Sequence, residues 1–420
     1  MNVLHLSTSD IDNGGARAAH RLHQGLRSLG CNSQMLVRAK FSSDDSVTAE
    51  RSPLTKLAPP VSELPLRLYS KQQGVFSPQW FPDVLAARAT ELNPDVINLH
   101  WVCNGYLRIE TLTQFKQPLV WTLHDMWPFT GGCHYNQDCD RYKTSCGSCP
   151  LLHSNRSKDL SRWVWQRKAK AWKNANLTIV ATTSWMADCA RSSSLFNNSR
   201  VEVIPLGLDT DKYRPLNQQF AREVLNLPQD KQLILFGAVN GTSDRRKGFH
   251  LLQPALQQLS KAGWQDSIEL VIFGASQPET AIDLGFKSHY LGYVRDDITL
   301  ALIYSATDVM VVPSLQESFG QTASEALSCG TPVVAFNATG LKDIVDHQKT
   351  GYLATPFEID DLAKGIAWML EDEERHQKLR FLAREKSLQE FASEVQAHRY
   401  LILYEKLLEN SSKVGVKDKS

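Results

Sequence analysis

Short apolar runs alternate with longer segments of helical period along most of this chain. The first half contains the runs NVLHLST, QMLVRA, DVINLHW, PLVWTLHD and LTIVATT, and the second half contains KQLILFGAV, IELVIFGA, HYLGYV, TDVMVVPS and PVVAF. These runs are typical of strands, whereas the segment ARAAHRLHQGLRSLG is typical of a helix that ends at Gly30. Such alternation predicts βαβ units with parallel sheets. Because the pattern starts twice, we predict an α/β chain with two doubly wound domains.

The length of 420 residues also favours two domains, since one ordinary core holds about 150 to 200 residues. The segment VEVIPLGLDTDKYRP, residues 201–215, lacks helical period and contains two prolines and a glycine, so it marks the boundary. We expect an N-terminal domain at residues 1–205 and a C-terminal domain at 206–390. A helix at 391–410 should pack back on the N-terminal domain, and the polar residues 411–420 should form a disordered tail.

The charge balance limits the partners of the chain. Lys plus Arg (46) nearly equals Asp plus Glu (45), so no overall field favours nucleic acid. The sequence begins MNVLHLSTSD, without a basic leader, and no run reaches the roughly 18 apolar residues of a membrane span. We therefore expect a cytoplasmic protein with no nucleic-acid partner.

The stretch PSLQESFGQTASEALSCGTPVVA, residues 313–335, holds two glutamates, Glu317 and Glu325, around the start of a predicted helix from Gly320 to Cys329. In open α/β sheets, anions bind at helix N-termini beyond the carboxyl ends of strands. A carboxylate repels phosphate and accepts hydrogen bonds from hydroxyl groups, so two carboxylates around a phosphate site suit a nucleotide-sugar. Local physics leaves a second interpretation open, in which the acids complement the helix dipole.

Several separated motifs occur in the order of a known family: NGGARAAHRL, WTLHD, VIPLGLDTDKYRP, RRKGFHLL, LVIFGA, and the spaced glutamates with GTPVVA and TGYLA. In these motifs the chain resembles the retaining glycosyltransferases of the bacterial group 1 (family 4) type. The resemblance implies the GT-B fold, in which two facing Rossmann-like domains have a cleft between them. The stretch WTLHDMWPFTGGCHY and the following cysteines resemble an exopolysaccharide, or colanic-acid-like, subgroup.

The family resemblance implies a nucleotide-diphosphate sugar donor and a saccharide or lipid-linked saccharide acceptor, with retention of configuration. It assigns catalytic roles to His124, Glu317 and Lys247. It places the donor against Gly14, Gly15, Arg245, Arg246, Ser318, Phe319, Gly320, Gln321, Thr322 and Glu325. The fixed cations and the helix N-terminus would stabilise the leaving diphosphate, so catalysis should require no cofactor.

One position departs from the family pattern. Members usually carry an arginine after the glycine that ends the first strand of the second domain, and here Ala238 follows Gly237. Either Arg245 or Arg246 would then supply the missing charge, and the alternative is that DRRK forms a solvated loop.

A cluster of cysteines interrupts the first domain. The four residues are Cys133, Cys139, Cys146 and Cys149. Four thiolates in one short loop can close tetrahedrally on a zinc ion, and such a closed site would be structural. Reduced thiols and disulfides stay open as alternatives, because the spacing is looser than in a zinc finger.

The stretch SRWVWQRKAKAWKN places Trp163, Trp165 and Trp172 among basic residues. It predicts either a helix in peripheral contact with an anionic membrane, at the inner face, or tryptophans in the domain core with the basic residues in water. Two other functions also stay open for the whole chain: a nucleotide-sugar epimerase of the same architecture and a non-catalytic zinc-binding interaction scaffold.

Overall fold

A computed structural model describes residues 1–237, 241, 243–277, 282–294 and 296–417, with side chains as far as Asn410. The chain divides into two compact units. One unit comprises Met1–Gly207 and the segment from Ser393, and the other comprises Leu208–Ala392. None of the helices in these described ranges combines the length and the apolar character that a membrane crossing requires.

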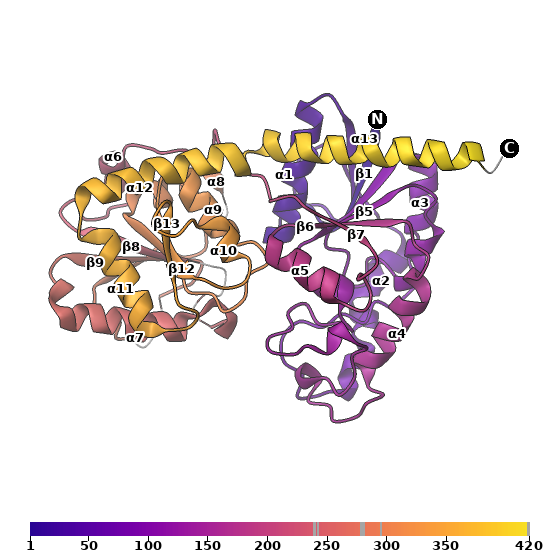
Figure 1. The fold of residues 1–420 in the computed structure, drawn as a ribbon, viewed down its shortest axis with the longest axis horizontal. Coiled ribbons are helices and arrows are strands. Elements are labelled where there is room, and N and C mark those ends of the chain that lie inside the picture. The colour runs from indigo at the N-terminus through magenta and orange to yellow at the C-terminus, as the bar shows by residue number, and fades with distance from the viewer. Residues whose placement is uncertain (238–240, 242, 278–281, 295, 418–420) are drawn as a thin grey trace. The chain divides into compact units, whose positions relative to one another are not determined.

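The first unit contains a parallel sheet with the strand order β3-β2-β1-β4-β5-β6-β7 (Figure 1). The strands are β1 (Asn2–Ser9), β2 (Asn32–Ala39), β3 (Val47–Ala49), β4 (Val96–Leu99), β5 (Leu119–Leu123), β6 (Leu177–Ala181) and β7 (Arg200–Val203). They confirm the strands expected in this half. Strand β3 was not expected, because three residues are too short for a clear strand pattern.

The helices of the first unit are α1 (Gly14–Ser28), α2 (Pro53–Ser62), α3 (Leu85–Leu92), α4 (Leu160–Trp172), α5 (Ser184–Ser192) and α13 (Ser393–Lys417). Helix α1 begins where the Asn13 side chain accepts a hydrogen bond from the Ala16 N–H group. It ends before Gly30, which has φ of 77°. The predicted helix is thereby confirmed.

The C-terminal helix α13 lies along α1 in the first unit (Figure 1). Tyr400 and Tyr404 of α13 are fully buried against the sheet. The Asn98 amide donates a hydrogen bond of 2.7 Å to the Tyr404 hydroxyl, and Thr122 and Tyr400 share one of 2.8 Å. The helix continues to Lys417. The expectation of a disordered tail over residues 411–420 stays a prediction.

The second unit contains a parallel sheet with the strand order β10-β9-β8-β11-β12-β13. The strands are β8 (Gln232–Gly237), β9 (Ile268–Phe273), β10 (Ser288–Tyr290), β11 (Val309–Val312), β12 (Val333–Phe336) and β13 (Gly351–Ala354). The helices are α6 (Gln218–Val224), α7 (Phe249–Leu259), α8 (Asp297–Ala306), α9 (Gln321–Ser328), α10 (Leu341–Ile344), α11 (Ile359–Leu370) and α12 (Glu373–Lys386). The prediction of two doubly wound, Rossmann-like domains is confirmed.

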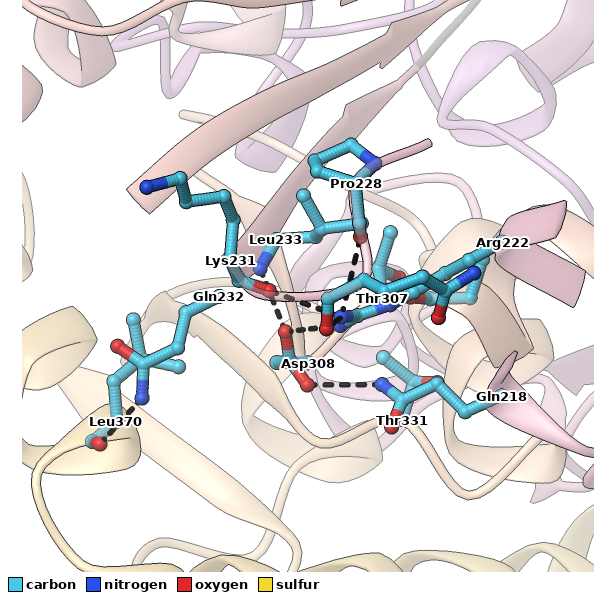
Figure 2. Close-up of polar contacts among 12 residues, drawn as sticks. Gln218, Arg222, Pro228, Lys231, Gln232, Leu233, Thr307, Asp308, Thr331 and Leu370 are labelled. Carbon is cyan, nitrogen blue, oxygen red and sulfur yellow. Dashed lines mark hydrogen bonds and ion pairs between the residues drawn. The ribbon is translucent and has the colours of Figure 1, made fainter. Parts of the chain in front are cut away.

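A buried ion pair holds the start of β8 in the second unit (Figure 2). The Arg222 guanidinium on α6 lies 2.8 Å from an Asp308 carboxylate oxygen, just before β11. The same oxygen accepts a 2.6 Å hydrogen bond from the Leu233 N–H group, while Arg222 also donates to the Lys231 carbonyl at 3.0 Å. Because these contacts join α6, β8 and β11, the pair fixes the strands that carry the loops of the candidate site.

Candidate active site

The loop between β11 and α9 is built around Gly320. This residue has φ of 98° and directly precedes α9. A φ of this value is strained for any residue with a side chain, so the turn favours glycine, and a Cβ atom there would lie 2.7 Å from a Leu341 methyl group. Ser318 and Phe319 are buried, and Gln321 and Thr322 are half-buried in the first turn of α9. The N-terminus of a helix carries N–H groups that lack partners within the helix, so it can bind an anion.

Lys247 and Glu317 form an ion pair at this loop. The Lys247 Nζ atom lies 2.6 Å from Glu317 Oε1, and the Ser314 hydroxyl donates to the same oxygen at 3.0 Å. Gly248, with φ of 76°, makes the approach possible, because a Cβ atom there would collide with the Pro313 carbonyl oxygen. The structure therefore brings together two predicted site residues that lie far apart in the sequence.

The surrounding charges keep Glu317 ionised. Burial is the largest single influence and raises the pKa of Glu317, but Lys247, Arg246 and the hydrogen bonds together lower it below its usual value. The Arg246 guanidinium lies 3.6 Å from the Glu317 carboxylate and 3.0 Å from that of Asp244. Arg245 is exposed. Of the two candidate arginines, Arg246 is thus the one beside Glu317, while Ala238 lies outside the described residues.

Glu325 lies within α9 and is buried. Its Oε2 atom accepts a hydrogen bond of 3.1 Å from the Tyr304 hydroxyl on α8. Burial, and secondly the charge of Glu325, raises the pKa of Tyr304 well above its usual value. A carboxylate placed in this way is an acceptor for hydroxyl groups.

In the first unit, His124 directly follows β5 and is half-buried. A Cβ atom on Gly15 would lie 3.5 Å from the His124 Cβ and Cγ atoms, so these two predicted residues are neighbours. Gly14 is the first residue of α1 and is exposed. Burial lowers the pKa of His124 to about 4, and Asp125 offsets part of this shift. The His124 ring is therefore neutral at pH 7.

Asp125 holds the loop that follows His124. Its carboxylate accepts hydrogen bonds from the His134 ring at 2.6 Å, the Trp101 indole at 2.8 Å and the Trp127 N–H group at 2.9 Å. Burial raises the pKa of Asp125, but the charge and hydrogen bonds of His134, Trp127 and Trp101 lower it overall.

Two buried histidines adjoin His124, and sequence reasoning missed their role. His100 Nδ1 lies 3.0 Å from His124 Nε2, and His100 Nε2 lies 2.9 Å from His5 Nδ1. The sequence holds one usable signal: each histidine lies in or just after a strand run, in NVLHLST, DVINLHW and PLVWTLHD. Only the order β1-β4-β5 shows that these strands are adjacent.

The four cysteines of the loop line one small cavity of about 20 Å³. All four are free thiols, and the Gly131 N–H group donates a hydrogen bond of 3.1 Å to Cys146 Sγ. Burial raises the pKa of the Cys133 thiol far above its usual value and that of Cys146 to about 12. Within the described ranges, no three His, Cys, Asp or Glu side chains are arranged to hold a metal ion. Zinc binding thus stays a prediction.

Helix α4 divides the tryptophan-rich stretch between core and surface. Trp172 is buried and its indole donates to the Ile109 carbonyl at 2.8 Å, whereas Trp163 is exposed with Arg167 stacked over it. Lys168 is fully buried, which corrects the expectation that the basic residues lie in water. Its Nζ atom donates to the Thr130 and Trp127 carbonyls and lies over the Trp127 ring, so polar and aromatic contacts replace water.

Two Rossmann-like units, one with a Lys–Glu ion pair beside a helix N-terminus, have the architecture of the GT-B fold. Residues 12–212 match the Glycosyltransferase Family 4 model, and residues 217–386 match the model described as Glycosyl transferases group 1. The chain therefore carries both of these glycosyltransferase domains. These matches do not support an epimerase or a non-catalytic scaffold.

Curated relatives match along most of the chain. The chain is 27% identical to a D-inositol 3-phosphate glycosyltransferase of Xylanimonas cellulosilytica, over 92% of this chain and 91% of the relative. It is 24% identical to the putative colanic acid biosynthesis glycosyl transferase WcaC of Escherichia coli, over 84% of this chain and 86% of the relative.

Solved structures agree with the fold. Sucrose-phosphate synthase from Thermosynechococcus elongatus has a TM-score of 0.69 with 21% identity, over 97% of this chain and 99% of that one. The Anabaena protein Alr3699/HepE in complex with UDP-glucose has a TM-score of 0.64 with 18% identity, over 98% of this chain and 100% of that one.

Proposed function

We propose that this protein transfers a sugar from a nucleotide-diphosphate sugar to a saccharide or lipid-linked saccharide, with retention of configuration. The pairing of Lys247 with Glu317 next to Gly320 and α9 carries the proposal. A cation and a helix N-terminus suit a diphosphate, and an adjacent carboxylate suits sugar hydroxyl groups. Retention rests on the resemblance of the spaced-glutamate motif to retaining enzymes.

The reaction breaks the bond between the donor sugar and the diphosphate, so negative charge grows on the leaving group. Lys247, with Arg246 beside it, and the N-terminus of α9 are fixed positive groups that stabilise this charge most in the transition state. Binding of the diphosphate would draw Lys247 partly away from Glu317. The freed carboxylate oxygen then accepts a hydrogen bond from the donor sugar, and Glu325 accepts from the ribose.

His124 supplies a neutral imidazole to the donor sugar. With a pKa of about 4, it is not charged at neutral pH, so its role is to form a hydrogen bond with a sugar hydroxyl group. Gly14 and Gly15 allow the ligand to approach the backbone at the start of α1. These contacts require no bound cofactor.

The acceptor class follows from the subgroup resemblance and from the relatives. One relative is named for colanic acid biosynthesis, another for glycosyl transfer to an inositol phosphate, and a structure of the same fold binds UDP-glucose. We therefore place this enzyme in the synthesis of an exopolysaccharide or another cell-surface glycan. A lipid-linked acceptor would bring it to the inner face of the membrane, where the exposed Trp163 and Lys170 of α4 could contact anionic lipid.

A thermal-shift screen tests the donor class. A ligand that binds only the folded protein at 100 times its Kd adds about 2.7 kcal/mol to the free energy of unfolding. We expect one nucleoside diphosphate and its sugar conjugate, with UDP and UDP-glucose as first probes, to raise the Tm of wild-type protein. The shift should shrink in Glu325→Ala, while Glu358→Ala, changed outside the site, should keep it. No shift with any nucleotide would refute the proposal.

We also propose that the cysteine loop binds a structural zinc ion. Cys133, Cys139, Cys146 and Cys149 line one small cavity, and four thiolates in one loop can close tetrahedrally on a zinc ion. Elemental analysis of purified protein should then find roughly one zinc per chain. The variant Cys146→Ser should lose the metal, and Cys329→Ser, at a buried cysteine elsewhere, should retain it. Metal-free protein with full activity would refute zinc binding.

A further inference from the structure

We propose that His100 and His5 act as positioning residues that fix the tautomer of His124, so that His124 presents its Nδ1–H group as a hydrogen-bond donor to substrate. The inference rests on the proposed function, because it assigns His124 to the reaction. It adds two buried residues, His5 on β1 and His100 directly after the neighbouring strand β4, that contact no substrate and act through His124 alone.

The three imidazoles form one continuous chain of ring nitrogens. His124 Nε2 lies 3.0 Å from His100 Nδ1, and His100 Nε2 lies 2.9 Å from His5 Nδ1. The ring centroids are 5.3 Å and 5.2 Å apart. The backbone holds this geometry, because the His100 N–H group donates to the Leu6 carbonyl and the Trp121 indole donates to the His100 carbonyl.

Each ring in the chain is neutral. His5 and His100 are almost completely buried. Burial, and then the neighbouring histidines, lowers the pKa of both well below the usual value. A neutral imidazole has one N–H group and one lone pair. Each contact between two rings therefore has one donor and one acceptor, and the direction of one hydrogen bond sets the direction of the other.

The surroundings of His5, at the end of the histidine row farthest from His124, determine which way the hydrogen bonds between the rings point. His5 Nε2 is buried and forms no hydrogen bond within the described part of the chain. His23 packs 5.8 Å away, but its two nitrogens are engaged by the Ser33 and Ser46 hydroxyls. A buried N–H group without an acceptor is rarer in proteins than an unpaired acceptor. We therefore place the lone pair of His5 at Nε2 and its proton at Nδ1.

The remaining protons follow from that assignment. His5 Nδ1–H donates to His100 Nε2, and His100 Nδ1–H donates to His124 Nε2. The one proton of His124 is then at Nδ1. This atom forms no hydrogen bond to another described residue, and the His124 ring is only half-buried. A sugar hydroxyl or another oxygen acceptor can receive that hydrogen bond.

The same geometry argues against a proton relay. If His124 gave its Nδ1 proton to substrate and drew protons along the chain, His5 would be left as a buried anion. If His124 took up a proton, His5 could pass no proton onward, because its Nε2 atom has no partner among the described residues. Either charge would be buried without compensation, at a large cost in free energy. His5 and His100 therefore set the orientation and the tautomer of His124, and the three rings together carry no net charge.

Nitrogen-15 NMR of histidine-labelled protein measures the tautomer without any substrate, and the spectrum of His124→Gln assigns the His124 signals. We expect His124 to be the Nδ1–H tautomer from about pH 6 to pH 8 in wild-type protein. In His5→Leu the donor that fixes the direction of the hydrogen bonds is lost, so both tautomers of His124 should appear. In His5→Asn the side-chain amide stands in for Nδ1–H, so the single tautomer should return. The Nε2–H tautomer in wild-type protein would overturn the inference.

Kinetics on the same variants connects the tautomer to turnover. With the nucleotide-sugar that gives the largest thermal shift, kcat in His5→Leu should fall about tenfold, with the donor KM nearly unchanged, and His5→Asn should restore it. Equal loss in both His5 variants would overturn the positioning role. His124→Ala separates the two proposals: if turnover persists in it, the assignment of His124 to the reaction is refuted, whatever its tautomer. If His124→Ala is inactive and the tautomer is Nε2–H, this inference alone fails.

Discussion

Replacing Lys247 by methionine should damage turnover far more than it damages stability. In the ligand-free protein, Lys247 Nζ lies 2.6 Å from Glu317 Oε1, and the two side chains are 20% and 12% exposed. A hydrogen bond to a charged group at such a site contributes about 1.5–3 kcal/mol. Ser314 at 3.0 Å and Arg246 at 3.6 Å still contact Glu317 after the change. We therefore expect a loss of about 1–2 kcal/mol in the free energy of unfolding.

The loss of turnover is set by a different interaction. If Lys247 stabilises the leaving diphosphate, its removal takes away one fixed charge in the transition state, which costs about 10²–10³ in kcat, or about 2.7–4 kcal/mol. Glu317→Gln should lower kcat by a similar factor, because it weakens the hydrogen bond that the carboxylate accepts from the donor sugar. Because the two side chains act on different parts of the donor, their effects on kcat should multiply in the double variant. Their effects on stability should fall short of additivity by about 1–2 kcal/mol, because they contact each other.

Urea unfolding and steady-state release of the nucleoside diphosphate measure the two quantities on the same preparations. Lys386→Met is the matched control in the same unit, because Lys386 is buried and lies 2.7 Å from an Asp346 carboxylate oxygen. It should lose comparable stability and keep its kcat. Near-wild-type kcat in both Lys247→Met and Glu317→Gln, or a loss no larger than that of the control, would refute the site assignment.

The backbone at the site and the buried ion pair give two further predictions. Gly248→Ala should destabilise the protein by more than the roughly 1 kcal/mol expected for Gly263→Ala in denaturant unfolding. Both positions have positive φ, but an added Cβ meets the Pro313 carbonyl at Gly248 and open space at Gly263, so equal losses would contradict the packing argument. Arg222→Met should cost about 3–5 kcal/mol because it leaves the largely buried Asp308 carboxylate without its ion-pair partner, whereas Arg200→Met, at an exposed ion pair, should cost less than about 1 kcal/mol. Similar unfolding midpoints for the two arginine variants would refute this account.

The C-terminal half of the site could be predicted well from the sequence, because its features are local. A strand run, a glycine and a helical segment follow one another around Gly320, and the observed β11 and α9 occupy these positions. The choice between Arg245 and Arg246 could not be predicted in this way. Adjacent residues point in different directions, and only the folded loop turns Arg246 toward Glu317 and leaves Arg245 exposed.

The sequence by itself determined the two parallel sheets and the helix that begins after Gly320. Periodicity, caps and turn residues act over a few neighbouring positions, so they can be read along the chain. Tertiary structure alone decided that Lys247 pairs with Glu317, that Lys168 is buried, and that His5, His100 and His124 form one chain. Those contacts join residues far apart in sequence, and they depend on which strands lie side by side and how closely glycine lets two loops approach.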